Sequence, residues 1–198
     1  SLYSPYIKLS FKEGIFPDYY YYITDTLSYG SFIQPAASSF KQTTGKWNMK
    51  TGEIKLVDYT HPVDEKKRIA FAVSIKCNVL VECNRRYDLI SLYDMNGKLQ
   101  CNVYGPNWSE KGDRKAHFKN VVICDDKIVA SYIGEDWNNN NGASVFHVFN
   151  IAGDYLKTLD VGRRINYFCY DEENKRIIMN LDSEYQFAYL EMEEYFNN

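Results

Sequence analysis

The chain has 198 residues, 45 % hydrophobic and 25 % charged, with a formal net charge of −3. These values are typical of one globular domain, and no apolar run reaches the roughly 18–20 residues that a membrane-spanning helix needs. A nucleic-acid-binding face requires clustered basic residues, whereas residues 66–68 form the only basic triplet, so nucleic acid is excluded as the expected partner. The aromatic content of 16 % favours strands over helices.

The first predicted unit, residues 7–60, is the least regular part of the chain. Strand patterns cover residues 19–25, 45–49 and 53–59, and Gly52 occupies the turn between the last two. Residues 29–44 mix turn and strand signals. The four tyrosines at 19–22 alternate between the two faces of a strand, so we expect two rings in the core and two exposed.

Three further units follow, at residues 67–105, 116–162 and 163–194. The second predicts strands at 68–75, 79–84, 89–94 and 99–104, and the third at 118–124, 127–133, 144–150 and 155–161. The fourth predicts strands at 165–170, 175–181 and 187–192 and stops before a fourth strand. We expect a strand near residues 7–11 to supply the missing one.

A glycine in the last turn of the first three units gives the repeat its period. Gly52, Gly97 and Gly153 are 45 and 56 residues apart by subtraction, and repeats of roughly 40–50 residues are typical of β-propeller blades. A lone hairpin cannot bury its apolar face, so successive units must stack. The expected fold is a single all-β domain over 1–198, with four-stranded antiparallel blades in a partial or incompletely closed ring. We expect breaks between blades near residues 60–67, 105–116 and 162–164.

One segment carries a family resemblance. SLYDMNGKLQCNVYGPNW, residues 91–108, resembles the blade end of the TolB-like six-bladed propeller proteins of Bacteroides-type bacteria, and YSPYIKLSF and GIFPDYYYYITD are similar to that family's N-terminal segments. The resemblance implies an exported periplasmic or cell-surface lipoprotein with no assigned reaction. Six blades need about 250–300 residues, so missing blades or an oligomer would complete the ring. SLYSPYIKLS lacks the basic and apolar regions of a signal peptide, so export would use a segment removed before it.

Candidate binding residues come from the loops. Antiparallel blades place the loops between second and third strands on the same face as the connections between blades. Here these segments are long and rich in Trp, Arg, Asn and Asp, so we expect ligands on that face. The candidates are Arg85, Arg86, Tyr87, Asn107, Trp108, Asp136, Trp137, Arg163 and Arg164.

Two interpretations of these residues stay open. Exposed tryptophans beside amides and carboxylates suit sugar recognition, but each tryptophan could instead cap the core of a blade. The paired arginines could hold an anion near the mouth of the central channel, or form ordinary surface salt bridges.

The catalytic inventory is poor. His61, His117 and His147 occupy non-equivalent blade positions, and the chain has no G-x-S-x-G nucleophile turn and no C-x-x-C pair. We therefore predict no cofactor, while a Ca²⁺ held by loop oxygens stays an alternative. The predicted function is that of an exported, non-catalytic binding or scaffold propeller with a glycan or protein partner. The alternative is a propeller hydrolase or lactonase-like enzyme that acts through carboxylates on the loop face.

Overall fold

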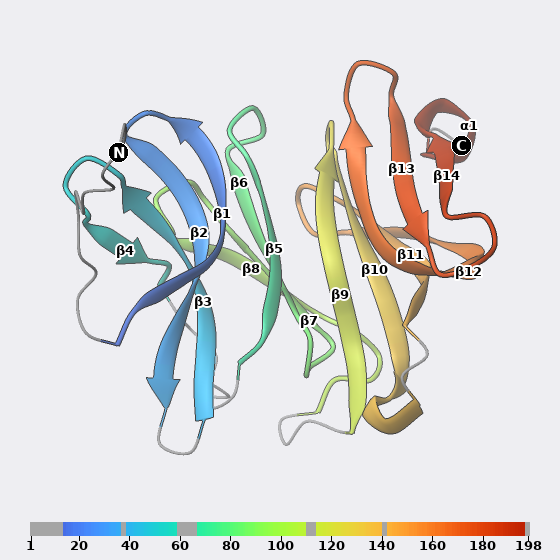
Figure 1. Ribbon diagram of the computed structural model, residues 1–198, viewed down its shortest axis with the longest axis horizontal. Helices are drawn as coiled ribbons and strands as arrows, with labels where there is room; N and C mark the ends of the chain where they lie inside the picture. The colour runs from blue at the N-terminus through green and yellow to red at the C-terminus, as the bar shows by residue number, and fades with distance from the viewer. Residues whose placement is uncertain (1–13, 37–38, 59–66, 110–113, 140–141, 197–198) are drawn as a thin grey trace, which may run out of the picture.

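The strands of the computed structural model form three antiparallel sheets (Figure 1). The structure describes residues 14–36, 39–58, 67–109, 114–139 and 142–196. The first sheet has the order β1-β2-β3-β4 and contains β1 (Phe16–Thr24), β2 (Leu27–Ala36), β3 (Ser39–Asn48) and β4 (Ile54–Leu56). The second has the order β5-β6-β7-β8 and contains β5 (Ile69–Ser74), β6 (Val79–Asn84), β7 (Leu89–Tyr93) and β8 (Leu99–Tyr104).

The third sheet has six strands, in the order β14-β13-β12-β11-β10-β9. They are β9 (Lys115–Cys124), β10 (Lys127–Asp136), β11 (Ala143–Asn150), β12 (Tyr155–Asp171), β13 (Arg176–Leu181) and β14 (Phe187–Glu191). A single 3-10 turn, η1 (Trp137–Asn139), follows β10, and a short helix, α1 (Met192–Phe196), follows β14. None of the described helices is long and apolar enough to cross a membrane.

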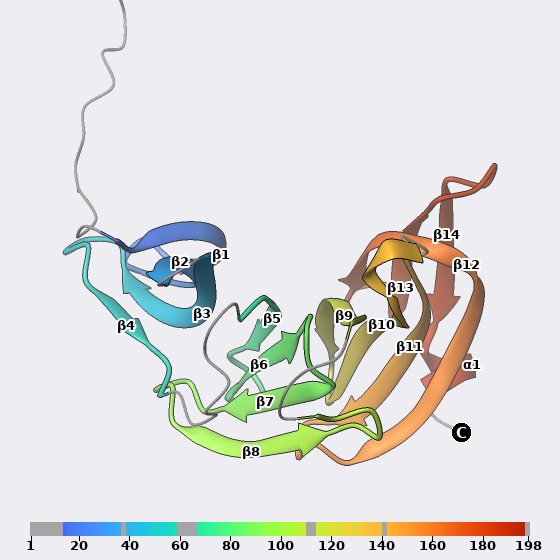
Figure 2. The same cartoon turned by 90° about the horizontal axis from the view of Figure 1, so that it is seen from below.

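The sheets follow one another along an arc that stays open between β1–β4 and β12–β14 (Figure 2). β8 and β9 belong to separate sheets, as the expected break near residues 105–116 requires. The expected all-β architecture of antiparallel units in an incompletely closed ring is therefore confirmed. The expected closing strand at residues 7–11 and most of the segment 60–67 lie outside the described residues.

The expected break at residues 162–164 is wrong. β12 continues through this segment, pairing first with β11 (Val145↔Asp160) and then with β13 (Ile165↔Leu181). Gly162 has φ +65° and lies at a register shift, so the strand bends there without leaving the sheet. Its second half then crosses β9, where Lys119 Nζ donates to Ile165 O at 3.1 Å. Units 116–162 and 163–194 are thus two halves of one folded sheet.

Two local expectations also need correction. Residues 29–44, which mixed turn and strand signals, belong largely to the long hairpin β2–β3. The strand expected at 187–192 ends at Glu191, because the chain turns into α1 and buries Met192 and Phe196.

Each layer of the arc packs against the next through its own hydrophobic cluster. The first cluster joins the first two sheets and contains Tyr29, Val57, Phe71, Leu80 and Tyr93. A second joins β5–β7 to β9–β11, and a third fills the fold of the six-stranded sheet. Burial between successive layers is the main source of stability in stacked repeats of this kind.

The recurring glycine turns contact the preceding layer. Gly97 has φ +84°, and a Cβ there would lie 3.1 Å from Val57 Cα in the first layer. Gly153 has φ +94°, and a Cβ there would lie 2.9 Å from Val103 Cγ2 in the second layer. The turn geometry and the close approach both require glycine, which explains why the period is visible in the sequence.

The open ends of the arc leave aromatic side chains exposed. On β1, Tyr19, Tyr20 and Tyr22 are exposed and Tyr21 is half-buried against Phe71, so the expectation of two core rings is wrong. β1 is one of the two edge strands of its sheet, and Tyr19 and Tyr21 line a cavity on the inner side of the arc, so these rings are covered less than strand alternation alone suggests.

Candidate ligand-binding site

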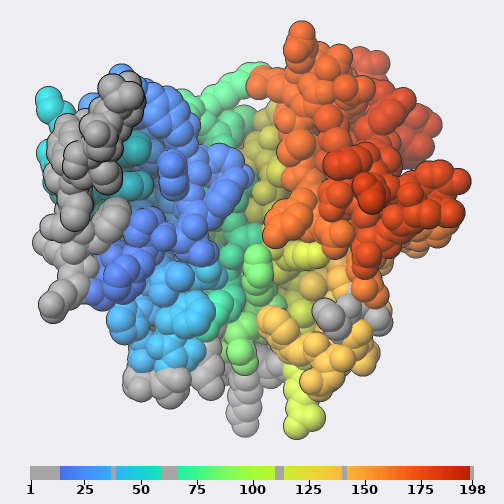
Figure 3. Space-filling model, in the orientation of Figure 1, coloured from blue at the N-terminus to red at the C-terminus, as the bar shows by residue number. Residues whose placement is uncertain are grey.

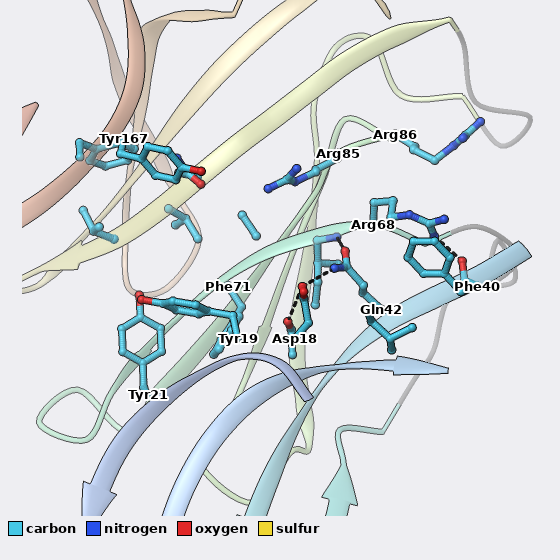
Figure 4. Close-up of a pocket in the computed structure, with 18 of the residues that line it drawn as sticks. Asp18, Tyr19, Tyr21, Phe40, Gln42, Arg68, Phe71, Arg85, Arg86 and Tyr167 are labelled. Carbon is cyan, nitrogen blue, oxygen red and sulfur yellow. Dashed lines mark hydrogen bonds between the residues drawn. The ribbon is translucent and has the colours of Figure 1, made fainter. Parts of the chain in front are cut away.

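A cavity of about 750 Å³ lies on the inner side of the arc, and the space-filling view shows a hollow between the first sheet and the six-stranded sheet (Figure 3). Ile69, Ala70 and Phe71 of β5 and Val121 and Val122 of β9 give it an apolar lining. Facing aromatic side chains come from β1 on one side, Tyr19 and Tyr21, and from β12 on the other, Tyr167 (Figure 4). We call this space the axial cleft.

Polar side chains line one end of the axial cleft. Asp18 Oδ2 accepts hydrogen bonds from Gln42 Nε2 at 2.7 Å and Ser31 Oγ at 3.4 Å. The Arg68 guanidinium lies over the Phe40 ring and donates to the Phe40 carbonyl (Figure 4). Burial lowers the pKa of Arg68, and the neighbouring charge of Arg86 lowers it further.

The backbone at Arg85 connects two layers of the arc. Its amide donates to Arg68 O at 2.8 Å, just before β5, and its carbonyl accepts from His117 N at 3.0 Å, in β9. The segment that follows β6 is thereby held between the two strands that line the cleft. This placement directs the Arg85 side chain into the cleft (Figure 4).

A smaller cavity of about 190 Å³ adjoins the cleft, and Arg85 and Trp137 line both spaces. The smaller cavity, which we call the side cavity, is also lined by Ala116, Phe118, Lys119, Ile133, Asp136 and Gly142. Arg85 Nη2 donates to Lys119 O at 3.2 Å, and the Arg164 stem lies against Gly142.

The position of Trp137 is fixed by its own turn. Asp136 Oδ1 accepts from Asn138 N at 2.9 Å, which caps η1, and Trp137 N donates to Arg114 O at 2.9 Å. Trp137 is 46 % exposed. An anchored backbone with a solvent-accessible aromatic face is suited to stacking against a ligand.

The structure divides the sequence-predicted residues into two groups. Arg85, Asp136 and Trp137 meet at the side cavity, with Arg164 beside it, and Arg86 lines the axial cleft. Tyr87, Asn107 and Trp108 form the second group, at the end of the second sheet.

This second group is part of the blade packing. The half-buried Trp108 ring lies 5.8 Å from Tyr87 and 4.8 Å from Tyr104 between ring centroids. Asn107 N donates to Asp88 Oδ2 at 3.0 Å. Trp108 is absent from the described linings of both cavities. Arg163 is exposed, and its guanidinium donates to Gly162 O at 3.1 Å.

Sequence reasoning missed several cavity residues. Arg68 entered the sequence analysis only as part of the basic triplet 66–68, and Lys119 and Tyr167 only as members of expected strands. These three residues could have been found from their position in the repeat. Each lies in or next to the first strand of its unit, and these first strands run along the inner side of the arc.

Neither described histidine lines the cavities. His117 is buried, with Nδ1 3.2 Å from Tyr132 Oη and 4.0 Å from Asp88 Oδ1. Burial lowers the pKa of His147, and the charge of Asp88 opposes that shift. His61 lies outside the described residues. Across the part of the chain that the structure describes, no group of three or more His, Cys, Asp or Glu side chains is arranged to hold a metal ion.

Comparison with solved structures identifies the architecture. BamB from Moraxella catarrhalis, a β-propeller protein, matches with a TM-score of 0.51 at 12 % identity, over 85 % of this chain and 42 % of that one. The fold is a partial β-propeller. The propeller domain of the trilobed protease from Pyrococcus furiosus gives a TM-score of 0.49 at 8 % identity, over 91 % of this chain and 54 % of that one.

The chain therefore spans about half the length of these two propellers. At such identities the likeness concerns the fold alone. No protein-family model matches the sequence, and no curated protein does.

Proposed function

We propose that this chain is a non-catalytic β-propeller binding domain and that its ligand occupies the axial cleft and the side cavity together. One observation carries the proposal: Arg85 and Trp137 line both spaces. A ligand that extends from one cavity into the other would contact a guanidinium fork and an exposed indole at the junction. Convergent polar groups in a largely apolar concavity are typical of small-ligand sites.

The aromatic side chains favour a glycan as the ligand. Indole and phenol faces stack on the C–H surfaces of sugar rings, while amides, carboxylates and guanidinium groups bond to hydroxyls. Tyr19 and Tyr167 face each other across the cleft, and Trp137 lies at the junction with the side cavity. A protein partner on this face is the alternative.

The hydrogen bonding at the cavities supports binding over hydrolysis. Among the described lining residues, two are carboxylates and both have structural roles, because Asp18 accepts from Gln42 and Ser31, and Asp136 caps η1. The described histidines bond or pack elsewhere. No specific observation favours the hydrolase alternative.

The test is a glycan array combined with thermal melts of wild type, Trp137→Ala and the matched variant Trp108→Ala. Loss of a stacking aromatic costs about 1 to 3 kcal/mol, so we expect Trp137→Ala to weaken binding roughly 5- to 150-fold at an unchanged melting temperature. Trp108→Ala should bind as wild type does and melt earlier. A wild-type protein that binds no glycan, or equal binding by both variants, would contradict the proposal.

We also propose the cellular address that the family resemblance implies, namely export as a TolB-like envelope protein. The support is the segment at residues 91–108. Fractionation of the source cells with an antibody against this chain should find it in the envelope or outside the cell. Recovery from the cytoplasm would refute the address without affecting the binding proposal.

A further inference from the structure

The side cavity is surrounded by positive charge. Arg85 and Lys119 line it, and Arg164 lies against Gly142 at its edge. Arg164 pairs with Asp182 at 3.2 Å. Within the described residues, Arg85 and Lys119 bond to carbonyl oxygens and have no carboxylate partner: Arg85 donates to Lys119 O, and Lys119 donates to Ile165 O.

Such an arrangement is unfavourable without a ligand. Desolvation and like charge both disfavour the ionised form of an amine. Burial lowers the pKa of Lys119, the charges of Arg85 and Arg164 lower it further, and Asp182 opposes the shift. A bound anion would offset these costs, because charge-assisted hydrogen bonds to arginine and lysine are the stronger kind.

The acidic groups nearby leave this imbalance in place. Asp136 is the one carboxylate among the described lining residues of the side cavity, and its Oδ1 accepts from the η1 backbone. The lining of the adjoining axial cleft contains two further cations, Arg68 and Arg86, and one carboxylate, Asp18. Positive charge therefore exceeds negative charge in both spaces.

The size and lining of the side cavity select among anions. At about 190 Å³ it is smaller than the roughly 300 Å³ at which pockets for whole ligands begin, so it fits one ring or head group. A guanidinium fork matches a carboxylate in two hydrogen bonds. Phe118 and the exposed Trp137 indole supply apolar surface beside the two cations, which a ring with C–H faces would cover.

We infer that the side cavity binds the uronic-acid residue of an acidic oligosaccharide. Its carboxylate lies between Arg85 and Lys119, its ring lies against Trp137, and the neighbouring sugars extend into the axial cleft towards Tyr167. This inference rests on the proposed function, since it names the class of glycan that the same site takes.

The test is calorimetric titration with three uronate probes: tri-galacturonate, tri-mannuronate and a hyaluronan tetrasaccharide. Whichever binds is compared with its methyl ester, which keeps the ring and removes the charge. Hydrogen bonds to charged groups contribute about 1.5 to 3 kcal/mol, so the ester should bind roughly 10- to 150-fold more weakly.

Charge-neutralising variants complete the test. Arg85→Gln and Lys119→Gln should each weaken binding of the acid at least tenfold and weaken binding of the ester much less, because the ester offers no charge for the lost cation to pair with. Arg163→Gln is the matched control, since its guanidinium bonds to Gly162 O and is absent from the described linings. It should bind as wild type does.

The outcomes separate this inference from the proposed function. If acid and ester bind equally, or only neutral glycans bind, the inference is overturned and the glycan function stands. If no uronate and no neutral glycan binds, both are overturned. Binding of poly-glutamate in place of every sugar would overturn both in favour of an acidic protein partner.

Discussion

The repeated glycine turns give the sharpest test of the stacked architecture. We predict that Gly97→Ala and Gly153→Ala each destabilise the domain more than Gly162→Ala does. All three glycines have positive φ, at +84°, +94° and +65°. Only the first two contact a neighbouring layer, because a Cβ at Gly162 meets nothing within 4 Å.

The magnitudes follow from two contributions. Left-handed backbone costs an L-residue about 1 to 2 kcal/mol, and this is the whole expected cost at Gly162. At Gly97 the new methyl lies 3.1 Å from Val57 Cα, which belongs to backbone and cannot rotate away. Overpacking typically adds about 1 to 3 kcal/mol, so we expect about 2 to 5 kcal/mol in total at Gly97. Gly153 should cost a similar amount, because Val103 Cγ2 would be at 2.9 Å.

Equilibrium unfolding in urea measures the three free energies. The midpoint should fall least for Gly162→Ala, with the same denaturant dependence in all variants, since the surface exposed on unfolding is unchanged. Equal losses at Gly97 and Gly162 would show that contact with the preceding layer contributes nothing. The stacking of layers through these turns would then be wrong.

Three further predictions concern buried, charged and aromatic groups. Glu82→Gln should lower the free energy of unfolding in urea by about 3 to 5 kcal/mol. The Glu82 and Lys67 side chains are 2 % and 4 % exposed and form an ion pair at 2.5 Å, so the substitution removes the charge that balances the buried Lys67 ammonium. Hydrogen bonding to Lys175 depresses the pKa of Asp125 below 3.8 in the folded protein. Wild type should therefore be more stable than Asp125→Asn at every pH above the pKa that Asp125 has in the unfolded chain. This difference in the free energy of unfolding should disappear as the pH falls through the lower pKa of Asp125 in the folded protein. Trp108→Ala should lower the melting temperature, and an unchanged value in calorimetry would contradict its packing role.

The fold was predictable from the sequence where backbone geometry restricts residue type. Gly97 and Gly153 must adopt positive φ and approach another layer, so their spacing revealed the repeat. Gly162 also has positive φ but lies at a bend inside β12. A glycine that bends a strand and a glycine that ends one occur in similar local sequence. The sequence around Gly162 therefore could not show whether the strand ends there or continues.

The candidate site was predictable only in part. Arg85 and Trp137 were identified because they follow strands on the loop-rich side. Trp108 has the same chemistry and a similar loop, but Tyr87 and Tyr104 pack against it, and those contacts depend on tertiary structure. Lys119 was missed because periodicity within β9 does not show that β12 crosses it.

The face of β12–β14 that borders the axial cleft at Tyr167 bears on the prediction that an oligomer or further blades complete the ring. Strand pairing places Tyr167, Asn180 and Phe187 in one row and Cys169, Ile178 and Tyr189 in the next. Tyr167 and Phe187 are each 70 % exposed, whereas a solvated sheet face normally carries polar residues. A third row, Asp171, Arg176 and Glu191, is charged. An apolar centre bordered by charge is how interfaces are commonly built. A blade that covers this face beyond the axial cleft would need apolar side chains opposite Phe187 and Tyr189 and polar ones opposite the third row, with Tyr167 left at the cleft.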